Sequence, residues 1–228
     1  MPVTVCWSVK GGSGTTVVAA ALALADPAHC TLVDLDGELP TVLGLDDPAG
    51  QGIGDWLASD APGSSLADLT VEVDATTVLV PCGRHDVDRQ SPRWAELATW
   101  LRTRPSAVVD AGTGAPPAGL VEAGGRSVLV TRGCYLGLRR AARVGHRPDG
   151  VVLVAEPGRS LGASDVGRAI GAPVIAVVSV DPAVARAVDA GLLTARLPRL
   201  LLREVRRLAD QHPPRQRPRA RLLTAASR

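Results

Sequence analysis

Short apolar runs alternate with alanine- and leucine-rich stretches along most of the chain. The apolar runs are rich in β-branched residues and predict strands at 3–8, 30–34, 69–73, 77–80, 107–110, 127–131, 150–155 and 174–179. The stretches between them predict helices at 16–25, 53–58, 92–102, 117–123, 135–144, 163–170, 182–190 and 198–211. Because the strands are apolar throughout, both faces of their sheet should be covered. The pattern therefore predicts an α/β fold, with a doubly wound, mostly parallel sheet and helices on both faces.

The composition changes near the C-terminus, and this divides the chain into two parts. Residues 1–212 should form one domain, and residues 213–228 are basic and proline-rich. The stretch 213–221 has no acid, so we expect a solvated, disordered tail. The alternative is that Leu222, Leu223 and the neighbouring arginines contact a partner or the surface of a membrane.

The net charge gives no strong signal for nucleic-acid binding, and the low aromatic content argues against binding of single strands. The formal net charge of the 228 residues is only +2, and aromatic residues make up 2% of them, with no phenylalanine. The four cysteines are far apart and form no C-x-x-C pair, so a zinc site is not expected. With no apparent signal peptide or membrane-spanning segment, we expect a reduced, cytoplasmic protein.

The strongest chemical signal follows the first predicted strand. The chain has 25 Lys and Arg residues together, and Lys10 is its single lysine. It opens the sequence KGGSGTT at 10–16, between a predicted strand and a predicted helix. Glycines let backbone N–H groups approach an anion, and a helix N-terminus adds partial positive charge. The stretch predicts a phosphate-binding loop, although Lys10 could also be an ordinary exposed residue at a strand end.

Three aspartates stand at the ends of predicted strands. Asp34 and Asp36 close the second strand, and Asp110 closes the strand at 107–110. Aspartate at a strand end is often only a turn former. However, the carboxyl ends of parallel strands meet at one edge of a sheet, where a phosphate loop would also lie. Together the acids predict a Mg²⁺ site beside bound phosphates.

These stretches resemble a known family. KGGSGTT at 10–16 is similar to the deviant Walker A motif of the ParA/MinD ATPases, K-G-G-x-G-K-[ST]. LVDLD at 32–36 resembles their second strand and switch I, and VVD at 108–110 resembles their Walker B strand. Residues 180–191 are similar to a late segment of the family, and the resemblance covers residues 3–211. The stretch 36–45 resembles the CpaE/TadZ branch, which is linked to pilus assembly and septum placement.

The resemblance implies roles for the matching residues, with ATP and Mg²⁺ as cofactors. Lys10 would reach the phosphates bound by the partner subunit of a nucleotide-sandwiched homodimer. Asp36 would position the attacking water, and Mg²⁺ would bind the Thr16 hydroxyl and, through water, Asp34 and Asp110. The backbone N–H groups of the loop would bind phosphate; they belong to Gly11, Gly12, Ser13, Gly14 and Thr15.

Two departures from the family pattern bear on activity. Thr15 stands where the family has a second lysine, which bridges the β- and γ-phosphates. Ala155-Glu156-Pro157 stands where the family often has an asparagine that contacts adenine. The sequence therefore favours a positioning or scaffold protein with weakened or lost ATPase activity, partnered by a pilus or secretion ATPase or a septum component.

Two other functions stay open at this stage. One is an active Mg²⁺-dependent ATPase that uses Lys10 alone. The other is a Rossmann-type NAD(P)-binding oxidoreductase, because Gly12-Ser13-Gly14 followed by Asp34 fits part of the dinucleotide-binding pattern. Against the oxidoreductase, Val17 occupies the third glycine position, and Lys10 and Asp110 are left unexplained.

Overall fold

Eight strands form one sheet in the order β3-β4-β2-β5-β1-β6-β7-β8 in the computed structural model, which describes residues 3–46 and 50–210. The strands are β1 (Val3–Ser8), β2 (Cys30–Asp34), β3 (Val71–Glu72), β4 (Thr77–Val80), β5 (Ser106–Thr113), β6 (Arg126–Arg132), β7 (Gly150–Ala155) and β8 (Val174–Ser179). Neighbouring strands pair in parallel, except that β3 runs antiparallel to β4. The predicted α/β class, with a mostly parallel sheet, is confirmed.

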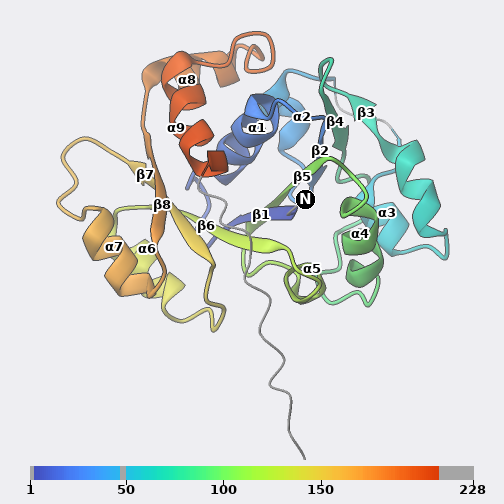
Figure 1. Cartoon of the computed structure of the whole chain (residues 1–228), viewed down its shortest axis with the longest axis horizontal. Coiled ribbons are helices and arrows are strands. Elements are labelled where there is room, and N and C mark those ends of the chain that lie inside the picture. The colour runs from blue at the N-terminus through green and yellow to red at the C-terminus, as the bar shows by residue number, and fades with distance from the viewer. Residues whose placement is uncertain (1–2, 47–49, 211–228) are drawn as a thin grey trace, which may run out of the picture.

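Helices cover both faces of the sheet. They are α1 (Thr15–Ala25), α2 (Leu39–Leu43), α3 (Ile53–Leu57), the 3-10 helix η1 (Gly63–Leu69), α4 (Trp94–Leu101), α5 (Ala118–Glu122), α6 (Tyr135–Ala141), α7 (Ala163–Ile170), α8 (Pro182–Asp189) and α9 (Arg199–Asp210). Figure 1 shows α1 and α9 on one side of the sheet and α4 to α7 on the other. The sheet is therefore doubly wound, as its apolar strands predicted.

The two faces of the sheet are packed differently. On one face the small side chains of α1 lie against the strands, and Ala19, Ala20, Ala21 and Ala23 are fully buried. Against the other face lies one buried cluster that includes all four tryptophans: Trp7 of β1, Trp56 of α3, and Trp94 and Trp100 of α4. Small alanine side chains let a helix pack closely on a sheet, whereas the bulky indoles fill volume on the opposite face. The tryptophans are therefore packing residues.

The strand order also decides between two nucleotide-binding folds. Strand β1 lies between β5 and β6, and β5 separates it from β2. In the dinucleotide-binding order 3-2-1-4-5-6 the first two strands are neighbours. The oxidoreductase alternative is therefore wrong for this chain. In the pairing of β2 with β5, Asp34 lies directly opposite Asp110, which brings these aspartates to the carboxyl edge of the sheet beside the end of β1.

Three elements differ from the sequence prediction. The predicted strand at 69–73 is reduced to the two exposed residues of β3, because η1 takes up Leu69 and buries Leu66 instead. Neither η1 nor α2 was expected, since both are too short to show a helical period. The remaining elements agree to within about three residues at each end.

The last helix, α9, has one apolar face and one charged face. Leu201, Val205 and Leu208 are buried against the sheet and α1, while Arg203 and Arg206 are exposed. In the part of the chain that the structure describes, no helix is long and apolar enough to cross a membrane. The predicted tail at 213–228 and its alternative contacts lie outside the described residues.

Candidate functional site

The loop between β1 and α1 forms an open cradle of backbone groups. Its turns require left-handed backbone at Gly12 and Gly14, whose φ angles are +73° and +88°. A side chain at Gly11 or Gly12 would meet no atom within 4 Å, so the backbone there faces open space. The Ser13 hydroxyl donates to the Lys10 carbonyl oxygen at 2.7 Å and closes the loop. The loop thus has the open, glycine-turned backbone that the sequence predicted at the N-terminus of α1. Binding of an anion by its N–H groups stays a prediction.

Lys10 and Thr15 are placed differently within this loop. Lys10 is exposed, and within the described residues its ammonium group makes no hydrogen bond or ion pair. Thr15, which stands where the resembling family has its second lysine, is buried as the first residue of α1. Of the two positions, only Lys10 presents a positive charge to the cradle.

Asp110 is a fully buried carboxylate with one oxygen left unpaired. Its Oδ1 accepts a hydrogen bond from the Gly112 backbone N–H at 3.0 Å, while Oδ2 has no partner. The pKa of this carboxyl is raised to about 7: burial is the largest cause, the charges of Asp34 and Asp36 add to it, and hydrogen bonds from the Gly112 N–H and the Thr16 hydroxyl oppose it. A buried orphan oxygen beside a hydroxyl is costly unless a cation or proton compensates it. The pair Thr16 and Asp110 therefore fits a Mg²⁺ ion.

Asp34 has a different environment, although it is equally buried. Its Oδ1 accepts from the backbone N–H groups of Asp36 at 3.0 Å and Gly37 at 2.8 Å, and its Oδ2 accepts from Leu39 at 3.1 Å. Burial raises its pKa, and the three backbone N–H groups oppose that shift. Asp34 thus fixes the turn that leads into α2. A water-mediated contact of Asp34 with Mg²⁺ stays a prediction.

Asp36 lies over the last residues of β5. Glycine is needed at position 112 there, because its φ is +58° and a Cβ would lie 2.2 Å from Cγ of Asp36. The exposed Asp36 carboxylate is thus held next to the segment that carries Asp110. Within residues 3–46 and 50–210, no three His, Cys, Asp or Glu residues are grouped as metal ligands, so any Mg²⁺ site here combines hydroxyl, carboxylate and ligand oxygens.

Two residues that the sequence analysis did not select hold this edge of the sheet together. The Ser8 backbone carbonyl accepts from Gly114 N–H at 2.8 Å, which joins the end of β1 to the loop after β5. Arg89, from the segment between β4 and α4, donates to the backbone carbonyls of Ala111 at 2.6 Å and Ala115 at 2.9 Å. The glycines at 112 and 114 signal a tight loop, but no sequence pattern indicates that Arg89 reaches it.

His85 and His146 have side-chain hydrogen-bond partners. His146 Nε2 lies 2.7 Å from the Oγ of Ser127, which also accepts from Trp7 Nε1 at 2.9 Å. Ser127 is fully buried at the start of β6, so this is a packing network. His85 Nδ1 lies 2.7 Å from Asp55 Oδ1. The pKa of Asp55 is lowered to about 2, because hydrogen bonds from His85, Gly52 and Arg84 outweigh the opposite effect of its burial.

The end of β7 carries an ion-pair cluster where the resembling family often has its adenine-contacting asparagine. Glu156 pairs with Arg132 and, at 2.8 Å, with Arg159. The hydrogen bond from Arg159 and the nearby charges hold the pKa of Glu156 below its ordinary value. Glu156 and Arg159 line a pocket of about 220 Å³ on the face covered by α6 and α7. Hydrogen bonding to an adenine base would have to come from other groups.

Solved structures of MinD and ParA proteins are similar to this chain over nearly their whole length. The septum site-determining protein MinD of Pyrococcus horikoshii, complexed with Mg-ADP, aligns with a TM-score of 0.73 and 23% identity over 92% of this chain and 95% of that one. A ParA family ATPase from Chlorobium tepidum aligns with a TM-score of 0.72 and 18% identity, over 92% of this chain and 99% of that one. The chain has the MinD/ParA fold.

A further similar structure is the MinC:MinD cell division complex of Aquifex aeolicus, with a TM-score of 0.72 and 20% identity over 95% of this chain and 99% of that one. No protein-family model matches the sequence, and no curated protein matches it either. At these identities the likeness defines the MinD/ParA fold, and function must be argued from the site.

Proposed function

We propose that this chain is a nucleotide-binding positioning or scaffold protein of the ParA/MinD type, with weakened or lost ATPase activity. One observation carries the proposal: an open glycine cradle adjoins the hydroxyl of Thr16 and the unpaired buried oxygen of Asp110. The similar structures include a septum site-determining protein, a cell division complex and a putative plasmid partition protein of Borrelia burgdorferi. Positioning is therefore the role we assign.

The residues present define how a nucleotide would be bound. Backbone N–H groups of the cradle and the start of α1 would bind phosphate oxygens, while Thr16 and Asp110 would hold Mg²⁺. The bound ion would neutralise phosphate charge. Asp36, held over Gly112, would orient a water molecule toward the terminal phosphate.

Thr15 limits what this site can do. A charge-assisted hydrogen bond contributes about 1.5–3 kcal/mol, so loss of a phosphate-bridging lysine weakens ATP binding roughly ten- to a hundredfold. The effect on hydrolysis should be larger, because negative charge develops in the transition state and a positioned cation stabilises it there. We therefore expect turnover near background.

Titration calorimetry with ATP and Mg²⁺ tests the proposal directly. Wild type should bind weakly, and Thr15→Lys should bind about tenfold or more tightly, because the rest of the cradle is in place. Asp110→Asn in the Thr15→Lys background should remove the Mg²⁺-dependent part of the affinity. If Thr15→Lys leaves the affinity unchanged and no Mg²⁺ dependence is measured, the cradle is not a nucleotide site.

Lys10 leads to a second element of the proposal, a nucleotide-dependent homodimer. The side chain is exposed and unpaired in the monomer, so it is available to phosphates held by a second copy. Lys10→Ala should leave the melting temperature nearly unchanged, because the side chain contributes no contact to the fold. Light scattering with and without ATP should show dimerisation of the wild type and less of it in Lys10→Ala. Equal dimerisation of both proteins would contradict an intersubunit role.

An active ATPase using Lys10 alone is the second candidate. The exposure of Lys10 favours it, because a long side chain free of partners can turn toward phosphates of its own subunit. Mg²⁺-dependent phosphate release that is abolished by both Lys10→Ala and Asp36→Ala, in protein that stays monomeric, would support this candidate over the scaffold.

The cellular role is proposed from resemblance alone. Residues 36–45 include the turn fixed by Asp34 and helix α2, and they resemble the CpaE/TadZ branch. We assign a cytoplasmic protein that positions a pilus or secretion ATPase or a septum component, with a peripheral membrane contact through the C-terminal segment. A fluorescent fusion should form foci at poles or septa. Even fluorescence throughout the cell would argue against a positioning role, whatever the nucleotide affinity.

A further inference from the structure

A second cavity lies between α8 and α9, apart from the glycine cradle. It has a volume of about 730 Å³ and is lined by α8, the segment that follows it and the first turn of α9. Figure 1 shows these two helices side by side at the top of the molecule. We call this cavity the α8–α9 pocket. Its size lies in the range of small-molecule sites.

Three arginines give the α8–α9 pocket a strong positive charge. Arg186, Arg196 and Arg199 line it, and within the described residues their guanidinium groups make no hydrogen bond or ion pair. The acid in the lining, Asp181, uses Oδ1 to accept from the Ala183 backbone N–H at 2.8 Å. Three arginines against one acid leave the lining with a net positive charge, and this arrangement favours a bound anion.

The first turn of α9 adds to this charge. Arg199 begins the helix, and no acid lies in the first turn. The N-terminus of a helix carries partial positive charge, so a cation there is in the unfavourable orientation. An anion in the pocket would offset both the helix end and the guanidinium groups.

One wall of the α8–α9 pocket is apolar. Leu192, Leu197 and Leu200 line it, and Leu192 is 49% exposed, which places it among the exposed large hydrophobic residues of the chain. Inorganic phosphate or another compact anion would leave this wall in water. A ligand with an apolar body would cover it and gain hydrophobic stabilisation.

The wall formed by the segment after α8 is already fixed. Leu193 is fully buried, and the Thr194 hydroxyl donates to the Leu43 backbone carbonyl at 2.7 Å. Gly44 and Gly191 pack backbone against backbone, since a Cβ on Gly44 would lie 1.9 Å from the Gly191 carbonyl oxygen. A preformed wall needs little ordering when a ligand binds, which favours affinity.

We propose that the α8–α9 pocket binds a small amphiphilic anion, with a phosphate or similar oxyanion head among the three arginines and an apolar chain against the three leucines. Residues 213–221 contain four arginines and no acid, so their charge does not complement this lining. The site would add an input separate from the nucleotide cradle. The anionic head can belong to a soluble metabolite or to a lipid.

Calorimetry with octyl phosphate tests the proposal on the full-length protein. We expect one equivalent of octyl phosphate to bind. Inorganic phosphate, which lacks the apolar chain, and octanol, which lacks the anionic head, should each bind at least about tenfold more weakly. Arg196→Gln should weaken octyl phosphate binding about tenfold, and so should Leu197→Ser. Arg206→Gln, an exposed arginine of α9 outside the pocket, is the matched control and should bind as wild type does.

The source of the head group is decided by a flotation assay with vesicles. Vesicles of phosphatidic acid in phosphatidylcholine that bind wild type but not Arg196→Gln identify a lipid, whereas octyl phosphate binding without vesicle binding identifies a soluble ligand. The proposal is overturned if octyl phosphate does not bind, or if Arg206→Gln weakens binding as much as Arg196→Gln does. Nucleotide titration of Arg196→Gln separates this site from the cradle, since ATP affinity should not change.

Discussion

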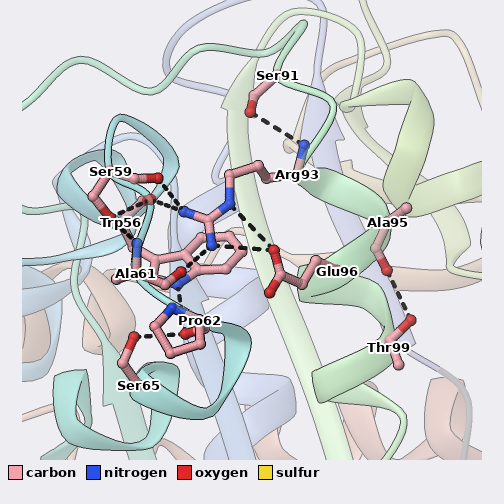
Figure 2. Close-up of polar contacts among 10 residues, drawn as sticks. All are labelled: Trp56, Ser59, Ala61, Pro62, Ser65, Ser91, Arg93, Ala95, Glu96 and Thr99. Carbon is pink, nitrogen blue, oxygen red and sulfur yellow. Dashed lines mark hydrogen bonds and ion pairs between the residues drawn. The ribbon is translucent and has the colours of Figure 1, made fainter.

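Arg93 should contribute more to stability than any ordinary surface arginine of this chain. Its guanidinium carbon lies 3.6 Å from the centre of the Trp56 ring, and the group donates to the backbone carbonyls of Trp56, Ser59 and Ala61. It also pairs with Glu96 at 3.1 Å (Figure 2). The Arg93 side chain is only 18% exposed, so these contacts are partly shielded from water. One side chain thus joins the segment after α3 to the start of α4.

The size of the effect follows from these contacts. Truncation to alanine removes donors from three carbonyls, at about 0.5–1.5 kcal/mol each, and a stacked cation worth about 0.5–1 kcal/mol. The ion pair adds little, because Glu96 is 43% exposed and a surface pair contributes about 0–1 kcal/mol. We expect Arg93→Ala to lose about 3 kcal/mol, which in a chain of this length lowers the melting temperature by about 6–12 °C.

Thermal unfolding followed by circular dichroism measures this change. Arg102→Ala is the matched control: this exposed arginine of the α4 C-cap also bonds a backbone carbonyl, that of Ala123, at 2.8 Å, but it stacks on no ring. The control should lose less than about 1 kcal/mol. Arg93→Lys should fall between the two, because lysine keeps the charge and loses the planar fork. If Arg93→Ala and Arg102→Ala unfold at the same temperature, the carbonyl contacts do not stabilise the fold.

Three further predictions concern Asp110, Arg89 and Glu204. Because the pKa of Asp110 is raised in the folded state to about 7, its contribution to stability is present below about pH 4 and is lost as pH rises through 7. Without Mg²⁺ or nucleotide, Asp110→Asn should therefore be more stable than wild type at about pH 8, by on the order of 3 kcal/mol, which thermal melting measures; no gain would contradict the burial argument. Arg89→Ala should speed hydrogen exchange at the end of β5 and in the loop after it, with β7 unchanged as the internal control; equal exchange would exclude a positioning role. The carboxylate of Glu204 accepts from the backbone N–H and the hydroxyl of Ser179 at 2.9 Å each, and so anchors α9 to β8. In urea unfolding, Glu204→Ala should lose about 2–4 kcal/mol of stability and Glu204→Gln less. Equal losses in the two variants would show that the hydrogen bonds are not responsible.

Local pattern was sufficient to predict the sheet, most helices and the cradle. Uninterrupted apolar runs such as 150–155 are buried on both sides only in a sheet that helices cover on both faces, so the fold class and the order of the layers follow from them. The role of the glycines at 12 and 14 can also be recognised from the sequence, because the left-handed backbone that they adopt between a strand and a helix is a local requirement. For the same reason, the sequence alone predicts the placement of Lys10 and Thr16 at the two ends of this loop.

Only the tertiary structure separated aspartates that look alike in sequence. Asp34 and Asp110 both end apolar strands, yet three backbone N–H groups satisfy Asp34, whereas Asp110 keeps an unpaired oxygen. The difference depends on the turn that follows each strand and on the neighbour across the sheet. Neither is encoded in the residues next to the aspartate.

The contacts of Arg89 and the α8–α9 pocket likewise depended on the assembled molecule. Arg89 reaches carbonyls more than twenty residues away in sequence, and the pocket arises where α8, its following segment and α9 meet. Periodicity reports which side of an element faces the core, because that depends on the spacing of residues within the element. It says nothing of which distant segment lies opposite, since that is decided only when the elements pack together.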